Sequence, residues 1–247
     1  MIKEMKKNNT AKEPKPEKEI AIILLSGGMD SAVSLGVLCR KYEPAALHLN
    51  YGQLTEPKEG ECFSRLCDHY GITKRLVVDV GYLQQIGGSS LTDHKITVPR
   101  ADLNSKEIPN TYVPFRNANI LAIATSWAEV IGAKKIFIGA VSEDSSGYPD
   151  TRPEFYRAFE KVIKTGTKAG GAIKIKTPVI KLSKAGIVSL AIKLKVPLHH
   201  TWSCYSANDK ACGVCDSCAL RLRGFAGAGA KDPIEYRETV FNTETFI

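Results

Sequence analysis

Six residues near the amino end have the types and the order that suit binding of a phosphate group. Ser26-Gly27-Gly28-Met29-Asp30-Ser31 follows an apolar run at residues 20–25 and precedes a segment with a helical pattern. The two glycines allow the backbone to turn sharply and to approach a ligand without an intervening Cβ atom. Their amides and those of a helix N-terminus form a cradle for an anion, to which Ser26 and Ser31 add hydroxyl donors. For the glycines alone, a plain turn from strand to helix remains the alternative.

A second group of reactive residues lies near the carboxyl end, where cysteines follow the pattern C-x7-C-x2-C-x2-C. Two residues between thiolates is the spacing with which a tight turn directs both sulfurs at one ion, and four ligands complete a tetrahedral zinc site. We predict a structural Zn²⁺ bound by Cys204, Cys212, Cys215 and Cys218. An iron–sulfur cluster and a redox or sulfur-carrying C-x-x-C remain open alternatives. With four cysteines available, the nearby His199 and His200 are assigned no role at the metal.

The complete string Ser-Gly-Gly-x-Asp-Ser after a strand resembles the PP-loop of the ATP pyrophosphatases. It differs from a Walker loop, because residues 26–31 contain no Gly-Lys-Ser/Thr with its phosphate-reaching lysine. The resemblance implies that ATP binds with its α phosphorus exposed, so that a substrate oxygen is adenylated and pyrophosphate leaves. It also implies nucleotide contacts along a continuous stretch: Leu25, Ser26, Gly27, Gly28, Met29, Asp30, Ser31, Ala32, Val33, Ser34 and Leu35.

Further sequence blocks narrow this resemblance. They are Asn50-Tyr51-Gly52-Gln53, Val113-Pro114-Phe115-Arg116-Asn117, the stretch GAVSEDSSGYPDTR that ends at Arg152, and Thr201-Trp202-Ser203-Cys204-Tyr205. Each block alone has the composition of an ordinary turn, helix start or surface loop. Their joint occurrence beyond strand ends, where α/β sheets bind ligands, favours a site. Together they resemble the 7-cyano-7-deazaguanine synthase family over nearly all of residues 20–235.

This resemblance implies an ATP-dependent ligase that converts 7-carboxy-7-deazaguanine and ammonia to 7-cyano-7-deazaguanine through adenylated intermediates, releasing AMP and diphosphate. It implies catalytic roles for Ser26, Asp30, Ser31 and Arg116, with Mg²⁺ shielding the phosphates in part through Asp30. Candidates for recognition of the deazaguanine substrate are Asp144, Tyr148, Asp150 and Arg152. Relatives also suggest a homodimer.

Two other functions remain open. A tRNA-modifying, thiolating PP-loop enzyme would share the loop, and the basic charge and the C-x-x-C spacing favour it superficially. A nonenzymatic nucleic-acid-binding zinc protein is the other, although the intact loop argues against it. The net charge of +8 does not decide among these functions, since a basic surface suits phosphate-bearing ligands as well as nucleic acid. We expect small-molecule partners and no direct nucleic-acid contact.

The chain contains no apolar run long enough for a secretory signal or a membrane span. We therefore expect a cytoplasmic protein with no membrane contact, whose cysteines are thiols or metal ligands. Cys39, Cys62 and Cys67 fall on predicted helices, and we expect them to be small buried apolar residues.

The elements that must position these residues alternate along the chain. Apolar runs predict strands at residues 20–25, 45–49, 75–80, 135–139 and 173–176. Helical patterns predict helices at residues 31–41, 56–70, 118–131 and 153–165, and a further helix from a cap at Ser183 to before Pro197. This alternation predicts an α/β fold with a doubly wound, mostly parallel, Rossmann-like sheet and helices on both faces. The family resemblance adds the adenine nucleotide alpha hydrolase type and the C-terminal four-cysteine region.

Three parts of the chain are expected. Residues 1–19, with six Lys and four Glu, form a disordered basic tail. Residues 20–200 form the PP-loop nucleotide-binding domain, and 201–247 form the zinc-binding region packed on the same domain. A long loop without a clean period spans residues 81–112, a length that usually marks a functional or mobile segment.

Overall fold

The structure, a computed structural model, describes residues 18–105, 107–141 and 147–238. The predicted tail up to residue 17 and the substrate candidate Asp144 lie outside the described residues. Within the described part of the chain, no helix combines the length and the apolar character that crossing a membrane requires.

Five strands form one parallel sheet in the order β3-β2-β1-β4-β5. They are β1 (Ile20–Leu24), β2 (Glu43–Asn50), β3 (Arg75–Asp79), β4 (Lys135–Ile138) and β5 (Lys174–Lys176). Leu24 at the end of β1 is in register with Leu47 of β2 on one side and with Ile138 of β4 on the other. The chain reverses its direction of progress across the sheet at β1, and this confirms the predicted doubly wound parallel sheet.

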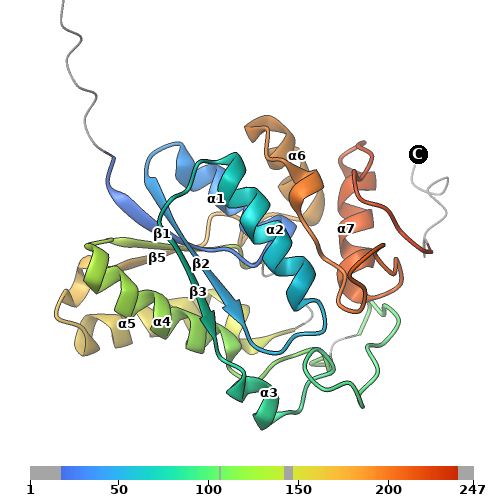
Figure 1. Cartoon of the computed structure of the whole chain (residues 1–247), viewed down its shortest axis with the longest axis horizontal. Helices are drawn as coiled ribbons and strands as arrows, with labels where there is room; N and C mark the ends of the chain where they lie inside the picture. Colours follow the sequence, from blue (N-terminus) through green and yellow to red (C-terminus); the bar gives the residue numbers. More distant parts are fainter. Residues whose placement is uncertain (1–17, 106, 142–146, 239–247) are drawn as a thin grey trace, which may run out of the picture.

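Helices cover both faces of the sheet (Figure 1). One face packs against α1 (Met29–Cys39), α2 (Glu56–His69), α6 (Lys184–Leu194) and α7 (Asp216–Gly227), and the other against α4 (Arg116–Ile131) and α5 (Pro153–Gly166). Strand β1 supplies both cores, because alternate side chains of a strand point to opposite faces. Ala21 and Ile23 belong to the first core, and Ile22 and Leu24 to the second.

Several elements differ from the prediction. Helix α7 and the short helix α3 (Tyr82–Ile86) were not predicted, nor were the 3-10 turns at Pro149–Thr151, Gly170–Ala172 and Leu198–His200. Helix α7 has few apolar residues in a regular pattern. It packs on α6, and its Phe225 belongs to the same buried core as Ile187 and Val188 of α6. The confirmed Ser183 cap accepts a hydrogen bond from the Gly186 amide at 3.2 Å, which orients α6.

The predicted burial of the helical cysteines is confirmed for Cys62 and Cys67, which are 4% and 0% exposed. Cys39 is only half-buried, because it lies in the last turn of α1 at the rim of the first core. Burial raises the pKa of each of these three thiols to about 11, so they stay protonated at neutral pH.

Replacement of Leu121 tests the core between α4 and the sheet, where this side chain is 0% exposed. Leu121→Ala should lower the free energy of unfolding by about 2 to 5 kcal/mol, the loss of buried area plus the cavity left behind. Val130→Ala on the same helix is the matched control, since Val130 is 82% exposed and should change stability by no more than about 0.5 kcal/mol. Urea unfolding measures both values, and equal losses would contradict the assigned packing of α4.

Candidate active site and metal centre

The predicted phosphate loop joins β1 to α1 at the centre of the sheet, and two glycines allow it to fit there. Gly27 has a φ of 86°, and a Cβ atom at this position would lie 2.7 Å from the carbonyl oxygen of Glu59 on α2. Gly139, just after β4, lies against the other side of the loop. A Cβ atom at this position would lie 2.5 Å from the amide nitrogen of Ser31. Neither position has room for a side chain, so the chain requires glycine at both.

Hydrogen bonds within the loop fix its shape. The Ser26 hydroxyl accepts from the Gly28 amide at 3.2 Å and lies 3.1 Å from the Ser31 hydroxyl, which donates to the Gly28 carbonyl at 2.9 Å. The loop is thereby held in one conformation before any ligand arrives. Such preorganisation reduces the entropy that a phosphate group must overcome on binding.

Two residues outside the loop anchor it: His48, which the sequence analysis missed, and Trp202, which belongs to one of the sequence blocks that favoured a site. The Nδ1 atom of His48 in β2 lies 2.9 Å from the carbonyl oxygen of Leu25, and the imidazole packs on the Phe63 ring at 5.0 Å. Burial lowers the pKa of His48, which keeps the ring neutral. From the carboxyl-terminal part of the chain, the Trp202 amide donates to the Gly27 carbonyl at 2.9 Å. A histidine within the apolar run of β2 was the one available signal for this role.

Asp30, at the start of α1, is paired with a lysine that the sequence analysis also missed. Its Oδ2 atom lies 2.7 Å from Nζ of Lys184, in the first turn of α6. The other carboxylate oxygen, Oδ1, is buried and has no hydrogen-bond partner among the described residues. An unsatisfied buried carboxylate oxygen beside a phosphate loop is a position that suits a metal cation, which supports a place for Mg²⁺ there.

A cavity of about 270 Å³ opens above the loop, at the carboxyl ends of β1, β2 and β4. Six of the predicted nucleotide-contact residues line it: Leu25, Ser26, Gly28, Met29, Asp30 and Ser31. The remaining residues of the predicted stretch do not line it, because Gly27 faces α2 and the side chains of Ala32, Val33, Ser34 and Leu35 are 0% exposed within α1. The structure therefore brings only the first part of this stretch to the cavity.

Arg116 occupies the first position of α4 and lines the same cavity as the phosphate loop. Phe115, just before it, has a φ of 58°, a left-handed conformation that costs energy for a residue with a side chain. The Arg116 guanidinium lies over the Tyr51 ring at 5.3 Å and donates to the Tyr51 hydroxyl at 2.9 Å. Burial raises the pKa of Tyr51 to about 12, so the phenol remains neutral and leaves the charge of Arg116 uncompensated by it.

The substrate candidates lie in different environments. Tyr148 lines the cavity and its hydroxyl lies 2.7 Å from that of Thr111. Asp150 is 4% exposed and does not line it; instead its Oδ2 atom accepts from the Asn117 amide at 3.0 Å, which caps α4. Arg152 is exposed and also does not line the cavity.

The long segment 81–112 forms part of the cavity wall. Its residues Ser89 to Thr92 are buried, the Leu91 carbonyl accepts from the Leu54 amide at 2.9 Å, and Leu91 lines the cavity. Farther along, the Ala101 amide donates to the Val214 carbonyl at 2.8 Å. The segment thus connects the cavity with the cysteine region.

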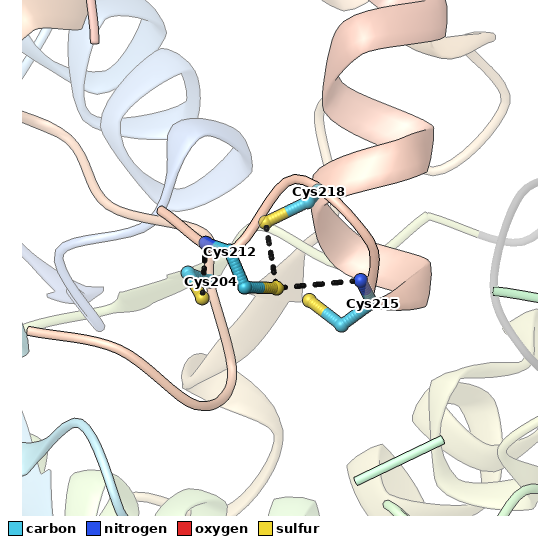
Figure 2. Close-up of side chains that lie close together, drawn as sticks. All are labelled: Cys204, Cys212, Cys215 and Cys218. Carbon is cyan, nitrogen blue, oxygen red and sulfur yellow. Dashed lines mark hydrogen bonds between the residues drawn. The ribbon is translucent and has the colours of Figure 1, made fainter. Parts of the chain in front are cut away.

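The four predicted metal ligands converge at the start of α7 and the loop before it (Figure 2). Their Sγ atoms all lie within 4.8 Å of one another, and those of Cys212 and Cys218 are 3.9 Å apart. A tetrahedral ion with bonds of about 2.3 Å to sulfur places its ligands about 3.8 Å apart, so the sulfurs fit one ion. Within the described residues this cluster contains neither His199 nor His200.

Backbone amides surround these sulfurs. Cys204 Sγ accepts from the amides of Ser206 and Cys212 at 3.4 and 3.3 Å, and Cys212 Sγ accepts from those of Val214 and Cys215, both at 3.4 Å. Hydrogen bonds of this kind stabilise thiolates and fix the direction of a ligand. The donor set and its surroundings therefore fit a metal ion.

A buried arginine holds the carboxyl-terminal region together and joins it to the segment before it. Arg221 of α7 is 1% exposed, and its guanidinium forms two bonds to the Asp232 carboxylate at 2.7 and 2.9 Å. It also donates to the Thr201 hydroxyl at 2.8 Å and to the Leu198 carbonyl at 3.3 Å. A bidentate pair whose remaining donors are satisfied is tolerated in the interior.

Comparison with known proteins gives a consistent result. A sequence model of the family described as queuosine biosynthesis protein QueC matches residues 20–229. A protein named 7-cyano-7-deazaguanine synthase from Chlorobaculum parvum is 58% identical over 217 residues, which are 87% of this chain and 96% of that protein. The protein of the same name from Chloroherpeton thalassium is 58% identical over 218 residues, 88% of this chain and 96% of its own length.

Two solved structures are similar to part of this chain. U34-tRNA thiolase NcsA from Methanococcus maripaludis gives a TM-score of 0.46 at 18% identity, covering 74% of this chain and 59% of that one. NH3-dependent NAD synthetase from Campylobacter jejuni gives a TM-score of 0.43 at 15% identity, covering 75% and 68% of the two chains.

The close approach of Gly139 to the phosphate loop can be tested with one added methyl group. Gly139→Ala should weaken binding of a nonhydrolysable ATP analogue at least about tenfold, because the Cβ atom must displace the Ser31 amide. Gly166→Ala, at the end of α5, is the control, since a Cβ atom there would meet nothing within 4 Å. Isothermal titration calorimetry measures both affinities, and unchanged binding by a folded Gly139→Ala protein would contradict a nucleotide site at this loop.

Proposed function

The chain belongs to the family of queuosine biosynthesis protein QueC, and we propose that it is a 7-cyano-7-deazaguanine synthase, a ligase that forms carbon–nitrogen bonds. In this reaction 7-carboxy-7-deazaguanine, ammonia and ATP give 7-cyano-7-deazaguanine, also called preQ0, with AMP and diphosphate as the other products. The product is an intermediate of queuosine biosynthesis. The partners of the protein are thus small molecules.

One observation carries the proposal at the level of the site: a preformed glycine loop and a charged arginine line a single cavity. The loop offers backbone amides and the N-terminus of α1, which attract phosphate oxygens. Arg116 offers a positive charge in the same cavity, where it can stabilise charge that develops on a phosphate during transfer. This cavity is where a carboxylate and an α phosphorus would meet.

The chemistry needs activation of a carboxylate and then of an amide. A carboxylate oxygen attacks the α phosphorus of ATP, the bond to pyrophosphate breaks, and an acyl adenylate forms. Ammonia attacks the acyl carbon, AMP leaves with the bonding electron pair, and a proton is lost to give the amide. The amide oxygen then attacks the α phosphorus of a second ATP, pyrophosphate leaves, and loss of one N–H proton gives an adenylated imidate. Cleavage of its C–O bond releases AMP, and loss of the last N–H proton leaves the nitrile. The substrate supplies each attacking oxygen, so no covalent nucleophile of the enzyme is required.

We assign the following roles within this scheme. Ser26, Gly27, Gly28, Asp30 and Ser31 would hold the phosphates, and Arg116 would stabilise charge on the α phosphate. Mg²⁺ would be held beside them by Asp30, whose Oδ1 atom is unpaired, and would shield the phosphate charge. Tyr148 is the substrate candidate that lines the cavity, whereas Asp150 would act by positioning α4.

For the cysteine cluster we propose a structural Zn²⁺. Sulfurs this close enclose the space of one ion, whereas a cluster of several irons would lie between its thiolates and separate them. Both cysteines of each C-x-x-C pair belong to the four-sulfur set, which argues against a sulfur-carrying role and therefore against the tRNA-thiolating alternative. We further propose a cytoplasmic homodimer, in keeping with a biosynthetic enzyme whose substrates are small and water-soluble.

The loop assignment predicts the products and their dependence on Ser31. The protein should release AMP and pyrophosphate in equal amounts when it is given 7-carboxy-7-deazaguanine, ammonia and ATP, with the nitrile detected by mass spectrometry. Loss of one hydrogen bond to a charged phosphate should lower kcat/KM of Ser31→Ala by about ten- to a hundredfold. Ser126→Ala, an exposed serine on α4, should not change it. Release of ADP and orthophosphate instead would overturn the proposed reaction.

The metal assignment predicts the content of the purified protein. Elemental analysis should find about one zinc per chain and no stoichiometric iron. Cys215→Ala should lose the zinc and melt at a lower temperature, since the ion links the cysteine loop to α7. Cys39→Ala, outside the cluster, should retain it. A stable, metal-free Cys215→Ala protein with normal turnover would contradict a structural role.

A further inference from the structure

One acidic residue of the cavity has no role in the functions assigned so far. Among the described residues that line the cavity, two carry a carboxylate, Asp30 and Glu59, and none is a histidine, cysteine or lysine. Asp30 is paired with Lys184. Glu59, in the first turn of α2, belongs to no ion pair that the structure describes.

The Glu59 carboxylate is held in place by neutral groups. Its Oε1 atom accepts from the Thr55 hydroxyl at 2.8 Å, and its Oε2 atom accepts from Nε2 of Gln53 at 3.1 Å. Gln53 is itself fixed, because its Oε1 atom accepts from the Tyr51 amide at 2.9 Å. Each carboxylate oxygen has a further lone pair for another donor, so the side chain is oriented without being fully satisfied.

Glu59 also lies between the phosphate loop and the end of β2. Its carbonyl oxygen is the atom that excludes a side chain at Gly27, and its side chain reaches the same cavity as Arg116. Burial is the main effect on the pKa of Glu59 and raises it. The hydrogen bonds from Thr55 and Gln53 and the positive charge of Arg116 act in the opposite direction and favour the ionised carboxylate. A carboxylate with a raised pKa is a better proton acceptor than an exposed one.

The proposed reaction removes four protons from nitrogen, because ammonium carries four N–H bonds and the nitrile nitrogen carries none. Ammonium must lose one to become ammonia, and the nitrogen loses another when ammonia has displaced AMP from the acyl carbon. The last N–H protons leave as the amide becomes an adenylated imidate and then the nitrile, when the C–O bond to AMP breaks and the third C–N bond forms. These steps need a proton acceptor close to the reacting carbon.

We propose that Glu59 is the general base of the nitrogen steps: its carboxylate binds the incoming ammonium and accepts protons from nitrogen as the amide and the nitrile form. The proposal rests on the proposed function. Under this proposal the cavity has two parts. The loop and Arg116 bind the phosphates in one part, and Glu59 accepts protons from nitrogen in the other. The proton passes from Glu59 to solvent between the steps.

The test separates adenylation from the nitrogen steps in the full-length protein. Glu59→Gln keeps the size and hydrogen-bonding shape of the side chain but removes the base. The first measurement is the exchange of labelled pyrophosphate into ATP, which depends on the carboxylate substrate and is made without ammonia. The exchange rate of Glu59→Gln should stay within about threefold of that of the unchanged protein. Formation of amide and nitrile after addition of ammonium should fall by about a hundredfold or more, the usual contribution of general base catalysis.

A pH profile adds a readout that a structural role would not change. The residual rate of amide and nitrile formation by Glu59→Gln should rise with pH up to the range in which ammonia is free in solution. At such pH the solvent accepts the protons that Glu59 would otherwise accept. Glu61→Gln on the same helix, an exposed residue paired with Lys58 and Arg65, is the control and should behave as the unchanged protein.

Other outcomes would overturn the proposal. A parallel fall in pyrophosphate exchange and amide formation would place Glu59 with the phosphates or Mg²⁺, and unchanged rates in both would make it structural. Should Glu59→Gln fail to fold, Glu59→Asp gives the same comparison, because the shorter side chain keeps the charge but places it farther from the nitrogen. Pyrophosphate exchange should then be retained and amide formation reduced. Failure of the proposed function itself would be seen separately, as absence of AMP and pyrophosphate with the unchanged protein.

Discussion

The structure depends on very close packing around the phosphate loop, the turn that joins β1 to α1. The chain leaves β1 at the centre of the sheet and must pass between α2 on one side and the end of β4 on the other. At Gly27 and Gly139 there is no room even for a methyl group. The backbone that results is bare, so its amides are available to a ligand, and the same contacts that exclude side chains hold the turn rigid. A binding site for phosphate is therefore a direct consequence of how tightly the three elements pack.

Distant parts of the chain complete the site. His48 fixes the start of the turn from β2, the Trp202 amide fixes its middle, and Lys184 of α6 pairs with Asp30 at its end. Trp202 lies at the start of the carboxyl-terminal cysteine region. The bond from Arg221 to the Leu198 carbonyl and the contact between Ala101 and Val214 join this region to the rest of the protein. A metal ion in the cysteine cluster would thus stabilise the segments that form one wall of the cavity, at a distance from the chemistry.

Charge is divided within the cavity in a way that suits the proposed reaction. Positive charge and backbone amides lie where phosphates would bind, whereas the unpaired carboxylate of Glu59 lies toward the end of β2. Tyr51 and Tyr148 line the same cavity, and burial keeps the Tyr51 phenol neutral. An arrangement of this kind allows one cavity to stabilise the negative charge of phosphate transfer and also to accept protons from nitrogen.

The sequence by itself determined the sheet, its parallel direction, the phosphate loop and the cysteine cluster, because each depends on residues that are close together in the chain. The apolar run of β1, the glycines after it and the C-x2-C spacing are local patterns with local causes. Helix α7 was not predicted, since packing on α6 rather than a regular apolar pattern stabilises it. Only the tertiary structure decided which predicted residues reach the cavity: it placed Val33 and Leu35 in the core, made Asp150 a cap for α4, and brought Lys184 and Glu59 to the site. Such contacts join residues far apart in sequence, and they are settled by the packing of helices against the sheet, which no short stretch of the chain contains.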